Sequence, residues 1–383
     1  MIYFDNAATS YPKPKEVGQA MMYFLEKVGA TPGRSGHRLS IEAGRILYQA
    51  RESLAELFNV DDPLRIIFTL NVTEALNLAL KGLLRPGDQV ITSSMEHNSV
   101  MRPLRELEKK GVEVKVVSCS PKGFLEPQDI EKSIRKNTRL IVLNHGSNVI
   151  GTLLPIIEVG KIARKYNILF LVDTAQTAGC YSLDIRKDNI DLLAFTGHKA
   201  LYGPPGTGGL IIGERVDTKK LTPLKEGGTG SHSEWEEQPD FLPDIYESGT
   251  PNIVGLNGLK EGVRFVLAKG VDKIHQHEKN LIIQLIEGLK EIPEVTLYGG
   301  DYRKEQVAVV SFNLKDKWPS EVGMRLDEEY DIMCRVGLHC SPATHKTIGT
   351  FPRGTVRFSM SWFNTLKEVD QAIMAIREIA KSV

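Results

Sequence analysis

Residues that could do chemistry follow several of the apolar, strand-like runs of this sequence. Thr73 follows the first run, His97 the second, Asp173 the fifth and Lys199 the sixth. A hydroxyl at the start of a helix can bind an anion, and an imidazole can stack on an aromatic ring or transfer a proton. A carboxylate after a buried strand is costly to leave unpaired and should meet a cation. A lysine beside these groups can bind a carbonyl covalently.

Each of these residues also has a simpler interpretation. Thr73 could be an ordinary helix N-cap, and His97 a hydrogen-bonded structural histidine. Lys199 stands in a turn of small residues, where a lysine is usually exposed. The chemistry needs all of these groups in one place, so the fold decides between the two interpretations.

Seven apolar runs alternate with helical patterns from residue 65 onward. Continuous apolar runs of this kind are typical of strands buried on both faces, and the alternation with helices predicts a mostly parallel, seven-stranded α/β sheet. Ligands bind at the carboxyl ends of the strands in such a sheet, where the polar residues would gather. The runs cover 65–70, 89–91, 112–117, 140–143, 168–172, 191–195 and 209–212.

The gathered groups match the requirements of pyridoxal phosphate (PLP). Its aldehyde needs a lysine for a Schiff base, its pyridinium nitrogen needs an acidic partner, and its phosphate needs helix N–H and hydroxyl donors. A nicotinamide site is the rival interpretation. However, the glycine-rich segment 203–209 does not follow the first strand and opens no clear helix, and no P-loop motif occurs.

The length of 383 residues suggests two domains. We expect a large PLP-binding α/β domain over 15–255, and a small α+β domain formed by 1–14 and 256–383 that carries Cys340. Apolar spacing predicts helices over 16–27, 41–58 with Ser40 as the cap, 258–289, 319–328 and 366–380. We expect strands over 295–298, 308–313, 332–335 and 355–360. The segment 225–252 is rich in Gly, Ser, Glu and Pro, which predicts a long ordered or gating loop.

Composition excludes several classes of function. Lys plus Arg equals Asp plus Glu at 48 each, so no basic excess indicates a nucleic-acid partner. The apolar runs are far shorter than a membrane span, and the N-terminus has no signal-peptide pattern, which predicts a cytoplasmic protein. The four cysteines have no metal-site spacing, and we expect free thiols and no metal. They are Cys119, Cys180, Cys334 and Cys340.

Motifs along nearly the whole chain resemble those of class V aminotransferase-fold enzymes (PLP fold type I) of the cysteine desulfurase family, in the NifS/SufS-like and selenocysteine lyase branch. Each motif alone is weak, but their order and spacing are specific to the family. The motifs are Tyr3-Phe-Asp-Asn-Ala-Ala8, Thr73-Glu-Ala75, Met95-Glu-His-Asn98, Ser147-Asn-Val-Ile-Gly-Thr152, Val172-Asp-Thr-Ala-Gln176, Gly197-His-Lys-Ala-Leu-Tyr-Gly-Pro204, Glu247-Ser-Gly-Thr-Pro-Asn252, Arg335-Val-Gly-Leu-His-Cys340 and Val356-Arg-Phe-Ser-Met-Ser-Trp-Phe-Asn-Thr365.

The resemblance implies a set of cofactor contacts. Lys199 would hold PLP and move the substrate Cα proton, while His97 would stack on the ring. Asp173 would pair with the pyridinium nitrogen and Gln176 with the phenolic oxygen. The phosphate would be bound by the Val72 backbone N–H, Thr73, Thr196 and His198, and by Thr250 from the other subunit of a homodimer.

The resemblance also implies the handling of the substrate. Arg357 would bind the substrate carboxylate, Asn148 would lie near the cofactor oxygen and the substrate, and His37 would approach the substrate from the N-terminal loop 31–38. Cys340 would be the nucleophile that takes sulfur from L-cysteine as a persulfide, leaving L-alanine. The other three cysteines would be structural, although Cys334 is the nearest contender.

Two positions depart from the pattern of many relatives. Leu338 stands where many have a second histidine, and Val72 replaces the first of two hydroxyls at the phosphate turn. These departures leave room for another substrate, so a selenocysteine lyase or another PLP-dependent C–S lyase is an alternative. A non-catalytic, PLP-binding scaffold for a sulfur-acceptor protein is a third hypothesis. The acceptor could serve iron–sulfur clusters, selenium or thiolated nucleosides.

Overall fold

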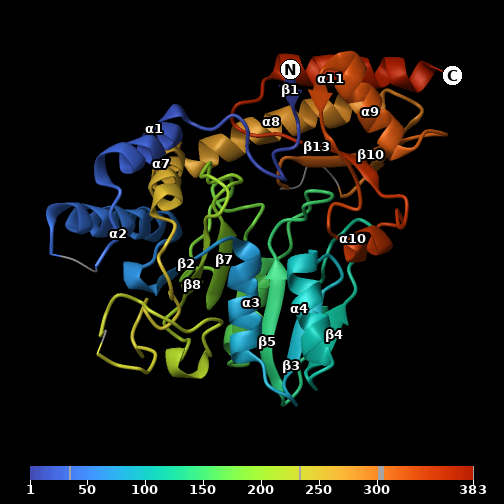
Figure 1. The fold of residues 1–383 in the computed structure, drawn as a ribbon. Coiled ribbons are helices and arrows are strands. Elements are labelled where there is room, and N and C mark those ends of the chain that lie inside the picture. Colours follow the sequence, from blue (N-terminus) through green and yellow to red (C-terminus); the bar gives the residue numbers. More distant parts are fainter. Residues whose placement is uncertain (34–35, 233, 301–305, 383) are drawn as a thin grey trace.

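The computed structural model describes residues 1–33, 36–232, 234–300 and 306–382, and its centre is one seven-stranded sheet (Figure 1). The strand order is β2-β8-β7-β6-β5-β3-β4, and only β8 runs against its neighbours. The predicted mostly parallel sheet is therefore confirmed. The strands are β2 (Ile66–Thr69), β3 (Gln89–Ser93), β4 (Glu113–Val117), β5 (Thr138–Asn144), β6 (Leu169–Asp173), β7 (Leu192–Thr196) and β8 (Gly208–Ile212).

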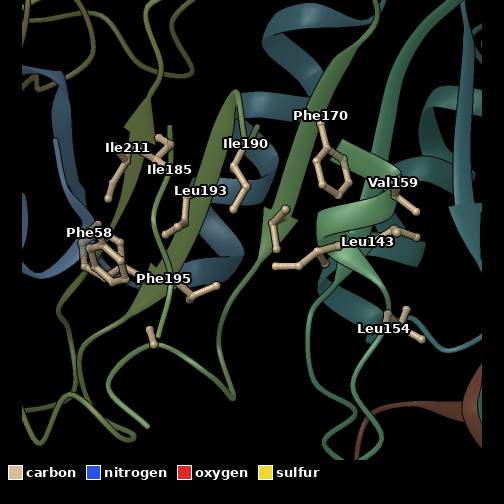
Figure 2. Packing of buried hydrophobic residues seen from close by; sticks show 14 of the residues in the cluster. Phe58, Leu143, Leu154, Val159, Phe170, Ile185, Ile190, Leu193, Phe195 and Ile211 are labelled. Carbon is tan, nitrogen blue, oxygen red and sulfur yellow. The ribbon is translucent and has the colours of Figure 1, made fainter. Parts of the chain in front are cut away.

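Alternate residues of the central strands enter two separate cores. On β7, Leu192 and Ala194 pack with helices α3 (Val72–Leu83) and α4 (Asn98–Glu108) on one face of the sheet. Leu193 and Phe195 enter the core on the other face, where Phe195 lies 6.0 Å from Phe58 between ring centroids (Figure 2). Each large apolar side chain buried in this way contributes about 1.5–3 kcal/mol. This burial on both faces explains why the strands appear in the sequence as continuous apolar runs.

The C-terminal part of the chain builds a second, antiparallel sheet over the ends of the first (Figure 1). Three helices cover it with a shared apolar core, and the last begins with a capping box between Thr365 and Glu368. The sheet order is β12-β13-β10-β9, with β9 (Val295–Tyr298), β10 (Val309–Leu314), β12 (Arg335–Gly337) and β13 (Thr355–Ser359). The helices are α8 (Val271–Lys290), α9 (Pro319–Tyr330) and α11 (Leu366–Lys381).

The N-terminal arm joins this second part. Strand β1 (Ile2–Tyr3) pairs in parallel with β11 (Ile332–Met333), and Asp5 forms a bridge with Ser359. Helix α7 (Ile253–Lys269) contacts both α1 (Lys15–Tyr23) and α2 (Arg38–Phe58). The division of the chain near residue 255 remains a prediction.

Four details differ from the sequence predictions. The helix expected over 258–289 is two helices, because Gly270 has φ of +85° and interrupts them. The cap of α2 is His37, whose Nδ1 accepts a hydrogen bond from Ser40 N at 3.2 Å, whereas Ser40 Oγ donates to Thr31 O. The strand expected over 332–335 divides at Cys334 into β11 and β12, which belong to different sheets. The short helix α10 (Pro342–Thr347) was not expected.

The segment 225–252 and five helical segments complete the described chain. Described residues of the segment 225–252 form only turns and bends, as expected of a loop; Ser233 lies outside the described residues. No helix in the described chain is long and apolar enough to cross a membrane. The remaining segments are the π-helical η1 (Phe24–Val28), α5 (Pro127–Lys132), α6 (Ile156–Lys165), and the 3₁₀ segments η2 (Pro63–Arg65) and η3 (Thr218–Lys220).

Candidate active site

A pocket of about 260 Å³ lies between the ends of the central strands and the C-terminal sheet. Its walls include eleven of the thirteen residues predicted from the sequence to form the site. His37 and Thr250 are the two that do not line it. The eleven are Val72, Thr73, His97, Asn148, Asp173, Gln176, Thr196, His198, Lys199, Cys340 and Arg357.

Lys199 and Asp173 face the same pocket from the ends of neighbouring strands β7 and β6. Burial lowers the pKa of Lys199 to about 8, although the charge of Asp173 opposes this shift. Burial raises the pKa of Asp173, whose Oδ1 accepts a hydrogen bond from Ala175 N at 2.9 Å. The turn that carries Lys199 needs Gly197, because a Cβ there would lie 2.1 Å from Thr207 Oγ1. The pair thus offers an amine that is easily deprotonated and a buried carboxylate able to bind a cation.

His97 is held in one orientation at the start of α4. Its Nδ1 accepts a hydrogen bond from Ser99 N at 3.0 Å, so a neutral ring carries its proton on Nε2. Burial, with a contribution from the charge of Lys199, lowers the pKa of His97 to about 4. The ring is therefore uncharged at neutral pH.

One end of the pocket can bind an anion. Asn71 caps α3 by accepting from Glu74 N at 3.1 Å, and its carbonyl accepts from Ala75 N at 3.2 Å. The backbone N–H groups of Val72 and Thr73 come before these two in the first turn of α3. Neither is used by this cap within the described chain, so both can donate to a ligand. Thr196 Oγ1 is buried there without a hydrogen-bond partner among the described residues.

A buried guanidinium also lines the pocket. Arg357 is 1% exposed, and its Nη2 lies 2.5 Å from Asp5 Oδ1, while its Nη1 donates to Asn148 O at 2.9 Å. Its Nε has no partner within the described residues. Asp5 was not predicted as a site residue, although it lies in the first motif. Gln176 also contacts the N-terminal arm, because its Nε2 donates to Ala7 O at 3.1 Å.

Cys340 is the one exposed thiol among the four cysteines, all of which are free. Arg335 Nη2 lies 3.7 Å from its Sγ. Burial raises the pKa of Cys119 to about 11, that of Cys334 to about 12 and that of Cys180 well above its ordinary value. These three thiols are therefore protonated and poorly nucleophilic at neutral pH, which favours Cys340 as the reactive cysteine.

The two predicted residues outside the pocket have other surroundings. His37 is exposed and caps α2, and it does not line this pocket, so its predicted approach to the substrate remains a prediction; the nearby Arg34 and Ser35 lie outside the described residues. Thr250 lines two other surface hollows, one of them shared with Arg51. That Thr250 binds the phosphate in the other subunit of a homodimer remains a prediction. No group of three or more His, Cys, Asp and Glu in the described ranges could hold a metal ion.

The residues of the pocket fit PLP. The unpartnered Thr196 hydroxyl and the α3 N–H groups suit a phosphate, and the Asp173 carboxylate suits a ring N–H⁺. Lys199 lines the same pocket as these phosphate-binding and carboxylate groups. The fold and the pocket thus define a class of protein: an α/β enzyme whose strand-end residues are suited to PLP.

Comparison with known proteins places the chain within that class. The family model of aminotransferase class-V matches residues 2–372, so the chain belongs to this family, and membership implies PLP. A protein of Pyrococcus abyssi described as a probable cysteine desulfurase is 36% identical, over all of this chain and 95% of that protein. A similarly described protein of Methanothermobacter thermautotrophicus is 34% identical over 99% of this chain and 94% of its own length.

Solved structures agree with the sequence relatives. The apo structure of a cysteine desulfurase from Thermococcus onnurineus superposes with a TM-score of 0.93 at 35% identity, covering all of this chain and 95% of that one. The cysteine desulfurase CsdA from Escherichia coli gives a TM-score of 0.86 at 26% identity, covering 98% and 94% of the two chains.

The lowered pKa of Lys199 predicts how the cofactor-free protein takes up PLP. Only the neutral amine attacks an aldehyde, and with a pKa of about 8 the neutral fraction rises about eightfold between pH 7 and pH 8.5. We expect the rate of PLP attachment, followed by its absorbance, to rise by a similar factor and to level off above pH 9. A rate that still rises steeply at pH 10 would indicate an ordinary exposed lysine.

Proposed function

We propose that the protein is a PLP-dependent cysteine desulfurase that converts L-cysteine to L-alanine and receives the sulfur on Cys340 as a persulfide. One observation carries the proposal: Lys199 and Cys340 line the same pocket. An amine suited to PLP and an exposed thiol are the two groups that this reaction needs. The cysteine desulfurases among the relatives support the same conclusion.

PLP, when bound, supplies an electron sink for the bond changes at the substrate. Lys199 would hold it and move the proton at the substrate Cα, for which an amine of pKa about 8 is well suited. Asp173 would pair with the ring nitrogen, Gln176 with the phenolic oxygen, and His97 would lie on the ring face. Val72, Thr73, Thr196 and His198 would hold the phosphate.

Cys340 would perform the sulfur transfer. Its thiolate attacks the substrate sulfur, so an Sγ–S bond forms while the substrate Cβ–S bond breaks, and a proton added at Cβ completes alanine. Arg335, 3.7 Å from Sγ, would stabilise the negative charge of the attacking thiolate. Arg357 would bind the substrate carboxylate, with Asn148 beside the substrate.

We also propose the setting in which this reaction takes place. Thr250 would complete the phosphate site of a second copy in a homodimer, which agrees with its absence from the pocket of its own chain. Four free cysteines suit a reducing, cytoplasmic compartment. A sulfur-acceptor protein or thiol would then remove the persulfide sulfur.

The test of the proposed function is product identification with the PLP-loaded protein. Incubation with L-cysteine should give alanine, together with one persulfide per chain that peptide mass spectrometry places on Cys340. Pyruvate and ammonia as products would instead indicate β-elimination. Turnover confined to selenocysteine in a parallel assay would indicate a selenocysteine lyase.

Replacing Arg357 by lysine should weaken substrate binding. Lysine keeps the charge but loses the planar fork that binds two carboxylate oxygens, a loss of about 1.5–3 kcal/mol. We expect KM for cysteine to rise about 10- to 100-fold in steady-state kinetics. Asp5→Asn, which removes the partner charge 2.5 Å from Arg357 Nη2, is the comparison variant and should change KM less. Equal KM values for wild type and Arg357→Lys would contradict the assigned role.

A further inference from the structure

The backbone at Cys340 has a conformation that its sequence disfavours. Ser341 N donates to Leu338 O at 2.8 Å and closes a four-residue turn. The two central residues have positive φ angles, 48° at His339 and 59° at Cys340. Positive φ at both central positions is the pattern of a type I′ turn, which normally contains asparagine, aspartate or glycine. Two residues with larger side chains stay in this region only if their surroundings hold them there.

One side chain holds the turn from both ends. Asn148 Nδ2 donates to His339 O at 2.7 Å, and Asn148 Oδ1 accepts from Ser341 Oγ at 2.9 Å. Both side chains are buried, Asn148 being 7% and Ser341 0% exposed. The amide of Asn148 thus contacts the residues on either side of Cys340, which is itself exposed. The thiol is the reactive group at an otherwise fixed turn.

Further contacts tie the turn to the large sheet and to β13. Asn98 N, at the start of α4, donates to Cys340 O at 2.9 Å. His339 Nε2 lies 3.0 Å from Thr355 Oγ1. In the following helix α10, Thr344 Oγ1 donates to Met95 O at 3.0 Å. The turn is therefore anchored directly beside His97, on the pocket wall.

We propose that Ser341 and Asn148 act as positioning residues: together they clamp Cys340 in the type I′ turn, so that Sγ stays in the pocket where substrate sulfur arrives. The inference rests on the proposed role of Cys340 as the sulfur acceptor. Holding two reacting groups in an attack geometry lowers the barrier, and a displacement of about 1 Å can cost about 100-fold in rate. Asn148 also accepts the hydrogen bond from Arg357 Nη1, so one residue links the thiol to the carboxylate-binding group.

The first test uses Ser341→Ala, because Ser341 holds the turn without lining the pocket. With the PLP-loaded enzyme, we expect kcat for alanine formation to fall about tenfold while KM for cysteine stays within twofold. Alkylation of Cys340 by iodoacetamide should become at least threefold faster, because the already exposed Sγ, once the turn is released, can meet the reagent in more orientations. The matched control is Ser53→Ala, which removes another buried serine hydroxyl, donating to Gln49 O on α2. Kinetics and alkylation of Ser341→Ala equal to those of this control would overturn the proposal.

The second test measures the conformational preference at position 340 without any catalytic readout. At a positive φ, glycine is favoured over alanine, the reverse of the usual order. The melting temperature of Cys340→Gly should therefore exceed that of Cys340→Ala by about 2 °C. A lower melting temperature for the glycine variant would overturn the strained-turn argument. Full desulfuration by Cys340→Ala would instead refute the proposed function, while the melting temperatures would still report on the turn.

Discussion

Lys199→Ala should lower the rate of alanine formation from cysteine by about 1,000-fold or more. The substitution removes the proposed attachment point of PLP and the proposed base for the Cα proton, and general acid–base catalysis alone contributes about 100- to 10,000-fold. The absorbance of lysine-attached PLP should disappear with it. Steady-state alanine assays and absorbance spectra of the reconstituted variant measure the two effects separately.

Lys13 provides the matched control for this prediction. It is a second lysine whose pKa burial lowers to about 8, and its Nζ donates to His198 O at 3.3 Å. It does not line the pocket that holds Lys199. Lys13→Ala should therefore keep both the attached-cofactor absorbance and most of the activity. If Lys13→Ala lost the absorbance and Lys199→Ala kept it, the assignment of the cofactor lysine would be wrong.

The sheet and the cofactor side of the pocket could be predicted because they depend on local signals. Strands buried on both faces read as apolar runs, and the residue after each run lies at the ligand-binding edge by topology alone. Asp173 and Lys199 were found in this way, and the structure places both in one pocket. Their roles toward PLP remain proposals, supported by the family to which the chain belongs.

The substrate side depends on contacts between distant parts of the chain. Asp5 and Arg357, 352 positions apart, meet because β1 pairs with β11 and the arm then bridges to Ser359. The two hydrogen bonds of Asn148 to the Cys340 turn span more than 190 positions. No spacing rule of a single sequence predicts such pairs.

The sequence predictions were wrong about two helix ends, the start of α2 and the end of α7. Ser40 matches the preferred chemistry of an N-cap, but His37 Nδ1 supplies the acceptor three residues earlier and extends α2 backward. Gly270 in a continuous apolar pattern looks like a tolerated helical glycine, whereas its positive φ separates α7 from α8. In both cases the local residue pattern is compatible with two backbone conformations, so it does not by itself determine where the helix begins or ends.

Cys340→Ala should abolish sulfur transfer while leaving the cofactor in place. The thiol is exposed and makes few contacts, so the free energy of unfolding should change by no more than about 0.5 kcal/mol. Alanine formation should fall at least about 100-fold, because Cys340 is the one cysteine among the described residues that line the pocket, and a persulfide needs a thiol acceptor. Alanine assays, absorbance of bound PLP and persulfide detection measure the three quantities on one preparation.

Cys334→Ala is the comparison that makes this result specific. Cys334 lies six residues before Cys340, but burial raises its pKa to about 12, so its thiol stays protonated at neutral pH. Its replacement should leave alanine formation within about twofold of the wild-type rate, because only a thiolate attacks sulfur efficiently. If Cys334→Ala were inactive and Cys340→Ala active, burial would not determine which thiol reacts. The expected order, in contrast, would tie sulfur transfer to the exposed thiol that Asn148 and Ser341 hold beside Arg335.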